Sequence, residues 1–223
     1  MTDGGRMDLH DALHWRYAVK AFAPGVRDDA ALDRALEAAR LAPSSFGLQP
    51  WRIVLVEDAA TRTALAARSY GQSKVETAGH LAVFAILDPV TEAHIDAHVA
   101  RLAGARGMDA AAQAKQRDRI ARTVLTYKDA DARRAWACAQ CYLGLGVFLA
   151  ACATEGLDAC PMEGFEVAAY DDILGLADAG LAAVVAVALG RRAADDPEAA
   201  EGKLRPPASE LIRRVGQAST PDR

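Results

Sequence analysis

Several motifs of common nucleotide-handling and hydrolytic enzymes are missing from this sequence of 223 residues. No Gly-x-Gly-x-x-Gly element follows an expected strand and no Gly-x-x-x-x-Gly-Lys-Ser/Thr occurs, so neither a Rossmann nicotinamide site nor a P-loop is indicated. The Gly-x-Ser-x-Gly elbow of serine hydrolases is also absent. A net charge of -4 argues against a nucleic-acid-binding surface.

The sequence also lacks the features of secretion, membrane insertion and interdomain linkers. Residues 1–7 contain no apolar segment, which favours a cytoplasmic protein, and we expect them to be flexible. The Ala/Val-rich runs at 143–153 and 180–190 are too short, or too interrupted by Gly and charge, to span a bilayer. No Pro/Gly/Ser-rich stretch divides the chain, so we expect a single domain over residues 1–223.

Cysteine and histidine are few and form no complete set of metal ligands. Cys138 and Cys141 have the spacing of a metal or redox pair, but they lie in an Ala-rich helical pattern without a second such pair. We interpret them as small core residues and expect no disulfides. His94 and His98 are neighbours on one helical face, yet no third ligand is evident, so a solvated helix face is the better interpretation.

The hydrophobic pattern predicts a layered domain with a central sheet. Helical periodicity occurs roughly at 8–15, 28–41, 58–68, 92–103, 109–127, 132–155, 167–175 and 208–215. Strand-like runs occur at 51–57, 80–88, 157–161 and 181–190. Because these runs are nearly continuous in apolar residues, helices should cover the strands on both faces, which indicates an α/β or α+β fold.

Two helical segments differ sharply in character. The segment from Trp136 to Glu155 is apolar around its circumference, so we expect it to be buried in the core or at a subunit interface. Gly144 and Gly146 would let another backbone approach this helix closely. By contrast, residues 109–134 are rich in charged and polar side chains, and their plain interpretation is a solvated helical excursion.

The segment Leu41-Ala-Pro-Ser-Ser-Phe-Gly-Leu-Gln-Pro-Trp51 separates a helical pattern from a strand. Pro43 is expected to end the helix. The loop offers the Ser44 and Ser45 hydroxyls, free backbone N–H groups near Gly47 and the Gln49 amide, which suit a polar, planar or phosphorylated ligand. An ordinary helix-to-strand connection is an equally good interpretation of this segment alone.

Three further segments occur in a suggestive order around this loop. They are Arg16-Tyr-Ala-Val-Lys-Ala-Phe22, Cys160-Pro-Met-Glu-Gly-Phe165 and Lys203-Leu-Arg205. Together with the Pro-Ser-Ser…Gln-Pro-Trp loop, they resemble the signature of the flavin-dependent nitroreductase family. The resemblance reaches from residue 16 to residue 205. It implies a nitroreductase-like fold of three layers, in which helices cover a central sheet, and an intertwined homodimer.

The resemblance implies FMN as cofactor and assigns its phosphate to three cations. Arg16, Lys203 and Arg205 match the family positions that bind the phosphate, where a guanidinium can bind two oxygens at once. Tyr17 and Ala18 stand where many relatives carry a His or Arg and a Ser, so one hydroxyl contact to the phosphate is lost.

The family pattern also implies contacts to the flavin ring. Lys20 and Lys74 match lysines near the pyrimidine edge, where positive charge favours the reduced anion, and Gln72 is an alternative to Lys74. The turn that follows a short strand presents a backbone N–H to flavin N5, with a carboxylate beside the ring. Its residues here are Pro161, Met162, Glu163 and Gly164, and Gly164 would permit close approach to the flat ring. A simple turn is the plain alternative for this segment.

The family's loop residues extend the implied cofactor site across a subunit interface. In a homodimer, the loop with Pro43, Ser44, Ser45, Gly47 and Gln49 would contact the FMN held mainly by the other subunit. Gly47 stands where some members have Asn. Phe46 and Leu48 would form an apolar wall suited to an aromatic or quinone-like acceptor. Residues 100–134 would provide a mobile cover over the substrate channel.

The function that the resemblance implies is an FMN-dependent oxidoreductase with a ping-pong cycle. NAD(P)H would reduce the flavin as co-substrate, and a nitroaromatic or quinone would then accept the electrons. One alternative is a specialised relative, such as a reductive dehalogenase or a flavin-fragmenting enzyme, which would need substrate-anchoring residues in the cover. Another is a non-catalytic flavin-binding or redox-sensing protein. No metal, nucleic acid or membrane partner is expected.

Overall fold

The computed structural model describes residues 6–216. Of the segment expected to be flexible, residues 1–5 lie outside this range, and nothing tests that part of the expectation. Met7 does not fit it, because its N–H donates to the Thr154 carbonyl at 3.0 Å. Arg6 adds an ion pair to Glu155 at 2.9 Å, so the chain is already fixed to the body at these two residues.

The described chain alternates helices with four strands. The helices are α1 (Leu9–Trp15), α2 (Asp29–Arg40), α3 (Ala59–Ala66), α4 (Lys74–Thr77), α5 (Glu92–Arg106), α6 (Ala110–Ala121), α7 (Ala130–Thr154), α8 (Val167–Leu174) and α9 (Ala208–Leu211). Short helical turns η1 (Ser45–Gly47), η2 (Arg122–Thr126) and η3 (Ala177–Ala179) connect some of them. The strands are β1 (Trp51–Leu55), β2 (His80–Leu87), β3 (Asp158–Met162) and β4 (Leu181–Gly190).

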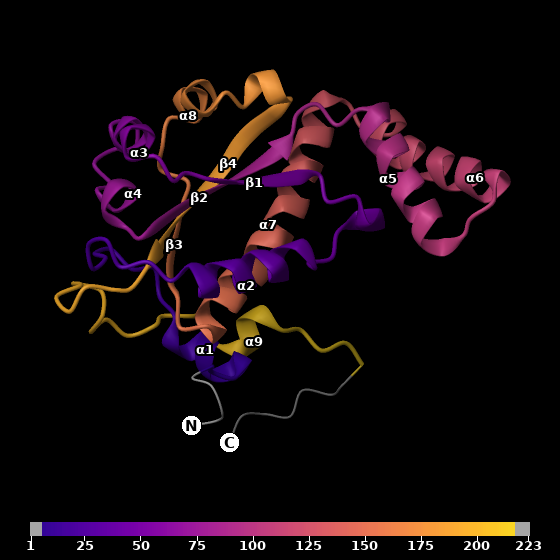
Figure 1. The fold of residues 1–223 in the computed structure, drawn as a ribbon. Coiled ribbons are helices and arrows are strands. Elements are labelled where there is room, and N and C mark those ends of the chain that lie inside the picture. The colour runs from indigo at the N-terminus through magenta and orange to yellow at the C-terminus, as the bar shows by residue number, and fades with distance from the viewer. Residues whose placement is uncertain (1–5, 217–223) are drawn as a thin grey trace.

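The four strands form one antiparallel sheet in the order β1-β2-β4-β3. Figure 1 shows α2 and α7 crossing one face of this sheet, with α3, α4 and α8 gathered on the other. The mixed fold with a central sheet between helical layers is therefore confirmed, and the antiparallel pairing makes it the α+β form. All four predicted strands are present within one or two residues of their expected ends.

Strand β2 separates two hydrophobic cores, and side-chain alternation assigns its residues to them. Phe84 and Ile86 pack in the core beneath α2 and α7, whereas Val83 and Ala85 pack in the core beneath α3, α4 and α8. Every residue of β2 is buried, as the continuous apolar run predicts. The edge strand β1 departs from this expectation, because only Trp51 is buried and Leu55 is 38% exposed.

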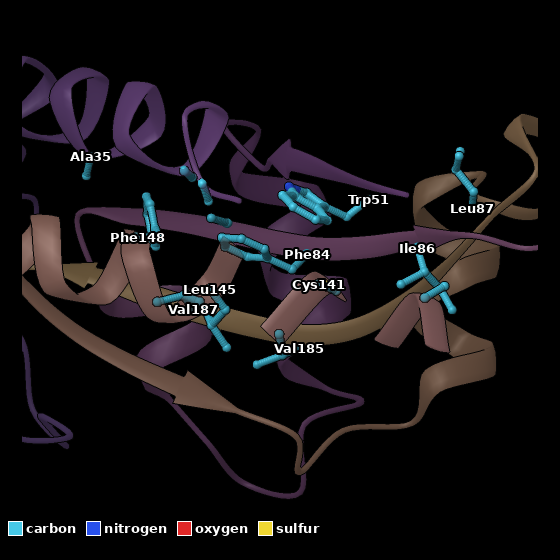
Figure 2. Close-up of a cluster of buried hydrophobic side chains, with 14 of the residues drawn as sticks. Ala35, Trp51, Phe84, Ile86, Leu87, Cys141, Leu145, Phe148, Val185 and Val187 are labelled. Atoms are coloured by element: carbon cyan, nitrogen blue, oxygen red, sulfur yellow. The ribbon is translucent and has the colours of Figure 1, made fainter. Parts of the chain in front are cut away.

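Helix α7 packs closely against the sheet at one glycine, because no side chain fills the space there. Figure 2 shows Trp51, Phe84 and Phe148 among the core side chains, and the rings of Phe84 and Phe148 meet edge to face with centroids 5.3 Å apart. A Cβ added at Gly144 would lie 2.9 Å from Cε2 and Cζ2 of Trp51, so the close neighbour is an indole ring and not the expected backbone. At Gly146 no atom lies within 4 Å of such a Cβ. The absence of a side chain at Gly144 thus lets the helix lie close to β1.

The opposite face of α7 is not buried within one chain. Tyr142 and Leu143 are 38% and 48% exposed, so the core of one chain buries only part of the circumference, and burial of the rest at a subunit interface stays a prediction. Among residues 6–216, α7 is the one helix that is long and apolar enough to cross a membrane by length and composition. Buried core helices pass the same test, and α7 packs against α1, α2 and the sheet.

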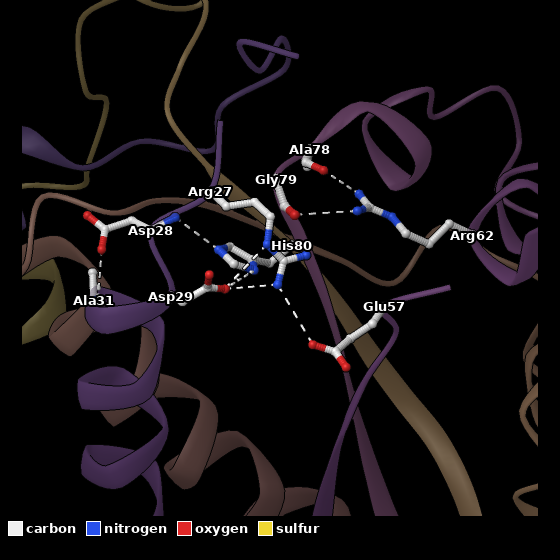
Figure 3. Close-up of polar contacts among 9 residues, drawn as sticks. All are labelled: Arg27, Asp28, Asp29, Ala31, Glu57, Arg62, Ala78, Gly79 and His80. Carbon is white, nitrogen blue, oxygen red and sulfur yellow. Dashed lines mark hydrogen bonds and ion pairs between the residues drawn. The ribbon is translucent and has the colours of Figure 1, made fainter. Parts of the chain in front are cut away.

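Polar contacts fix the segments that precede α2 and β2 (Figure 3). Asp28 caps α2 by accepting the Ala31 N–H at 3.0 Å, and its own N–H donates to Nε2 of the buried His80 at 3.1 Å. The buried Arg62 donates to the carbonyls of Val75 at 3.1 Å and Ala78 at 2.5 Å. These bonds join α3 to α4 and to the segment that precedes β2.

Helices α5 and α6 form an excursion that stands apart from the body in Figure 1. Arg117 joins the two helices through ion pairs to Asp96 at 2.6 Å and Glu92 at 3.0 Å. Ile120 and Val124 are fully buried and anchor the end of the excursion in the core. The predicted polar helical excursion is present. The predicted helix at 208–215 is shorter, since α9 ends at Leu211.

We predict that Gly144→Ala lowers the free energy of unfolding by about 1–3 kcal/mol, because the added methyl group must displace the embedded indole of Trp51. Gly104→Ala on α5 is the matched control, since no atom lies within 4 Å of its new Cβ. That control should be neutral or slightly stabilising. Chemical denaturation of both variants measures the difference, and equal stabilities would contradict the packing role of Gly144.

Candidate functional site

A cationic cavity of about 440 Å³ lies where the two ends of the described chain meet. Six predicted site residues line it: Arg16, Tyr17, Ala18, Lys20, Lys203 and Arg205. The Lys203 ammonium donates to the carbonyls of Leu13 and Arg16, the latter at 2.6 Å, and so joins the C-terminal segment to the end of α1. The structure thus brings together residues from the first and last predicted motifs.

The cavity also contains the carboxylates of Glu198 and Glu201, but its cations outnumber them and lie close together. Burial and the neighbouring charge of Arg205 lower the pKa of Arg16. Burial, Arg16 and Arg205 likewise lower the pKa of Lys203. Cations that destabilise one another in this way are complementary to an anion with more than one negative charge, such as a phosphate.

Two buried carboxylates lie beside the segment from Arg16 to Lys20, and Asp196 contacts it directly. Asp196 accepts the N–H groups of Lys20 at 2.9 Å and Ala21 at 3.1 Å. Asp158, at the start of β3, accepts Arg192 Nε and Nη2 at 2.9 and 2.5 Å. A parallel bridge between Ala18 and Ala159 places the segment beside β3.

The pKa of Asp196 shows how strongly these contacts favour its charged form. Burial alone raises the pKa of this carboxyl group, but backbone N–H donors from Ala21, Glu198 and Lys20, with the charge of Arg192, outweigh burial. The net result is a pKa below the ordinary value. Asp196 is therefore ionised at neutral pH and holds the backbone on which Lys20 is carried.

Tyr17 lies inside this arrangement with its hydroxyl unpartnered. The Arg192 guanidinium lies 4.5 Å from the Tyr17 ring centroid and 4.3 Å from that of Trp15. The Tyr17 Oη atom is buried and has no hydrogen-bond partner among residues 6–216. An orphaned hydroxyl beside a cationic cavity is costly unless a bound group satisfies it.

The end of β3 forms a second part of the site with α4. Lys74 is 7% exposed, and its Nζ donates to Gln72 Oε1 at 2.8 Å. Gln72 Nε2 in turn donates to the Gly164 carbonyl at 2.6 Å. Burial and the nearby charge of Lys20 lower the pKa of Lys74, although the Coulomb interaction with Cys160 opposes this. Gln72 and Lys74 are thus members of one hydrogen-bonded chain.

The turn at Pro161–Gly164 is constrained by neighbours that the sequence did not reveal. A Cβ at Gly164 would lie 2.9 Å from Gln72 Nε2, so in the described chain an amide, and not a flavin ring, occupies the space beside this glycine. The Tyr142 hydroxyl on α7 donates to Glu163 Oε1 at 2.6 Å. Burial and this hydrogen bond raise the pKa of Tyr142, which keeps the phenol neutral.

The loop with Pro43, Ser44 and Ser45 lies apart from the cationic cavity and uses most of its polar groups internally. The N–H groups of Gly47 and Leu48 donate to the carbonyls of Ser44 and Ser45, and the Ser45 N–H donates to Gln140 at 2.8 Å. The expectation of free N–H groups near Gly47 is therefore wrong at these positions. The turn needs left-handed backbone, with φ of 59° at Phe46 and 46° at Gln49.

Other expectations for this loop are corrected as well. The Gln49 amide donates to the carbonyls of Arg40 and Ala42 at 2.8 and 3.0 Å, so it caps the end of α2 instead of pointing to a ligand. Leu48 is 5% exposed and joins the core. Gly47 and Gln49 line a separate cavity of about 500 Å³ that shares no residue with the cationic one.

The cysteine and histidine expectations have different outcomes. Cys141 is buried on α7, Cys138 is half-buried, and both are free thiols, which confirms their role as small packing residues. His98 contradicts the expectation of a solvated helix face. It is 8% exposed, and its Nε2 lies 3.1 Å from the Phe46 carbonyl. No group of three metal-ligating side chains occurs within residues 6–216.

Comparison with known proteins identifies the family. The family model described as "Nitroreductase family" matches residues 13–191. The chain belongs to the nitroreductase family. It is 33% identical over 218 residues, covering 93% of this chain and 96% of the relative, to a Staphylococcus aureus protein provisionally named NAD(P)H nitroreductase.

Solved structures of nitroreductase relatives have the same fold. A Bacillus subtilis protein, provisionally named a nitroreductase, superposes with a TM-score of 0.83 at 21% identity and covers 93% of this chain and 99% of its own. A provisionally named nitroreductase from Exiguobacterium sibiricum, solved in complex with FMN, superposes with a TM-score of 0.80 at 20% identity. It covers 96% of this chain and 100% of its own.

We predict that Asp196→Ala lowers the free energy of unfolding by about 1–3 kcal/mol, because the buried N–H groups of Lys20 and Ala21 lose their acceptor. Amide hydrogen exchange at these two positions should accelerate. Asp195→Ala, which removes the same charge from an exposed neighbour, is the control and should change neither quantity. Unchanged exchange in Asp196→Ala would disprove the anchoring role of Asp196.

Proposed function

We propose that this nitroreductase-family protein is an FMN-dependent oxidoreductase that takes hydride from NAD(P)H and reduces nitroaromatic or quinone-type acceptors. The observation that carries the proposal is the convergence of Arg16, Lys20, Lys203 and Arg205 on one cavity. The FMN bound to the Exiguobacterium relative and the NAD(P)H nitroreductase name of the Staphylococcus relative support it. We also retain the cytoplasmic location as a prediction.

The residues present fit the chemistry of FMN. Three crowded cations suit a phosphate dianion. Burial lowers the pKa of Lys74, which indicates that its ammonium group lacks a close anionic partner. An anionic ring edge beside Lys20 and Lys74 would provide that partner.

Each part of the site has a distinct task in this proposal. When bound, FMN supplies hydride acceptance and donation. Arg16, Lys203 and Arg205 bind its phosphate, while Lys20 and Lys74 favour the reduced, anionic ring by their charge. The Pro161–Gly164 turn orients the ring edge, and the hydrogen bond from Tyr142 keeps the Glu163 carboxylate beside it in one rotamer.

A homodimer would complete this site. The exposed apolar face of α7, with Tyr142 and Leu143, adjoins the Glu163 turn through the 2.6 Å bond between Tyr142 and Glu163. The Ser44–Gln49 loop does not reach the cationic cavity of its own chain. Pairing two chains through α7 would bury the apolar face and would bring each loop to the partner's cofactor.

The decisive experiment is the visible absorption spectrum of the purified, FMN-loaded protein before and after anaerobic addition of NADPH or NADH. Bleaching of the flavin bands, followed by turnover with nitroaromatic or quinone acceptors, would support the proposal. Bound FMN without NAD(P)H oxidation would favour a flavin-binding or redox-sensing role. Selective turnover of halogenated phenols would favour the reductive dehalogenase alternative, and no FMN binding at all would overturn the proposal.

We predict that Arg205→Ala and Lys20→Ala each weaken FMN binding at least about ten-fold, because a charged hydrogen-bonding partner is worth roughly 1.5–3 kcal/mol. Quenching of FMN fluorescence on binding measures the dissociation constants. Arg68→Ala is the control, because its exposed ion pair to Glu166, at 3.5 Å, lies outside the cavity. Wild-type affinity in both test variants would remove the assignments of these two residues.

We predict that Leu143→Arg shifts the protein from dimer to monomer, because a charge on the apolar face of α7 must be desolvated in the interface. Light scattering coupled to size-exclusion chromatography measures the mass. Val167→Arg on α8, which starts from a similarly exposed apolar side chain at 39%, should leave the mass unchanged. A monomeric wild-type protein that retains FMN would disprove the dimeric site.

A further inference from the structure

A groove of about 540 Å³ runs along α6 and η2, on the excursion. Its lining residues are Lys115, Asp118, Arg119, Arg122, Thr123 and Tyr127. The three cations follow one another at helical spacings of four and three residues, so they share one face of the helix. All three are exposed, as is Tyr127, whose relative exposure is 75%.

Within residues 6–216, the cations on this face of α6 lack the ion pairs that neutralise the cation on the adjoining face. On the adjoining face, Arg117 is neutralised by Asp96 and Glu92 and holds α6 to α5. Lys115, Arg119 and Arg122 form no ion pair within the described part of the chain, and Asp118 is the one carboxylate in the groove. A local excess of positive charge thus stands on a chain whose net charge is -4.

The groove adjoins the loop that the dimeric site would use. The Arg119 guanidinium lies 5.3 Å from the ring centroid of Phe46, within cation–π range. The Phe46 carbonyl contacts His98 on α5, so the loop and the excursion are held together from two sides. A ligand in the groove would therefore extend towards the ligand contacted by the Ser44–Gln49 loop.

The composition of the groove fits one ligand class. Guanidinium and ammonium groups bind phosphate oxygens, and an exposed tyrosine ring offers a flat surface for a heteroaromatic base. A volume of about 540 Å³ lies in the range of small-molecule sites. A dinucleotide with several phosphate charges and an adenine base satisfies all of these features.

We propose that Lys115, Arg119 and Arg122 bind the phosphate groups of the nicotinamide donor, with its adenine stacked on Tyr127. This inference rests on the proposed function and deepens it. The excursion would thereby set the affinity for the donor without contacting the hydride that is transferred. Its cations would determine the selectivity for NADPH over NADH if the 2′-phosphate is the group they bind.

The test compares the double variant Lys115→Ala/Arg122→Ala with Arg68→Ala/Arg106→Ala, which removes two exposed cations outside the groove. Binding of NADP⁺ and NAD⁺ to the FMN-loaded protein is measured by isothermal titration calorimetry. The groove variant should bind NADP⁺ at least about ten-fold more weakly than the wild type. The control variant should bind it with wild-type affinity.

A hydride donor without phosphate groups tests whether the groove affects donor binding or the hydride transfer itself. Oxidation of 1-benzyl-1,4-dihydronicotinamide should be unchanged in the groove variant, while the KM for NADPH rises. A larger loss with NADPH than with NADH assigns the 2′-phosphate to the groove, and equal losses assign the pyrophosphate. Both results support the proposal.

Three outcomes would overturn the inference. They are unchanged NADP⁺ affinity, an equal loss with the phosphate-free donor, and a rise in KM for 4-nitrobenzoate alone, which would make the groove an acceptor site. Failure of the wild-type protein to oxidise any of these donors would instead refute the proposed function. The two failures are therefore distinguishable in one set of measurements.

Discussion

Strand β2 is buried at every residue, and this constraint determines where the other parts of the molecule lie. Because its alternate side chains enter two different cores, helices must cover both faces of the sheet. Most charged side chains lie at the ends of the strands and in the segments that extend beyond the sheet. The buried Arg62 and Lys74 belong to a helical layer, where carbonyl and amide oxygens accept their hydrogen bonds.

The candidate site follows from that distribution of charge. Asp158 begins β3 and Asp196 follows β4, and both are buried at 4–5% exposure while fully occupied by hydrogen-bond donors. Asp196 holds the backbone of Lys20, Asp158 holds Arg192 against the Tyr17 ring, and an isolated bridge from Ala18 to Ala159 places this segment beside β3. Arg16 and Lys20 thus lie beside the sheet, although they belong to irregular chain.

The strands and long helices were predictable because periodicity and continuous apolar runs report burial directly. The residues of the cationic cavity were predictable only through family motifs, since isolated Arg and Lys residues have no distinctive pattern. Contacts between distant segments were not predictable in this way. Trp51 occupies the space left at Gly144, because three-dimensional packing brought these two groups together. Even the local cap that Gln49 places on α2 depends on the left-handed turn between them, which no sequence pattern marks. Asp196 had no sequence signal beyond its position after a strand.

The cationic cavity unites residues near the two ends of the described chain, and this has a consequence for biosynthesis. Arg16 and Lys20 leave the ribosome long before Lys203 and Arg205, by on the order of 10 to 40 s at usual rates of translation. All four strands are made before the last of these cations. An anion can therefore meet all four cations only after the segment with Lys203 and Arg205 has been made and has docked at the end of α1.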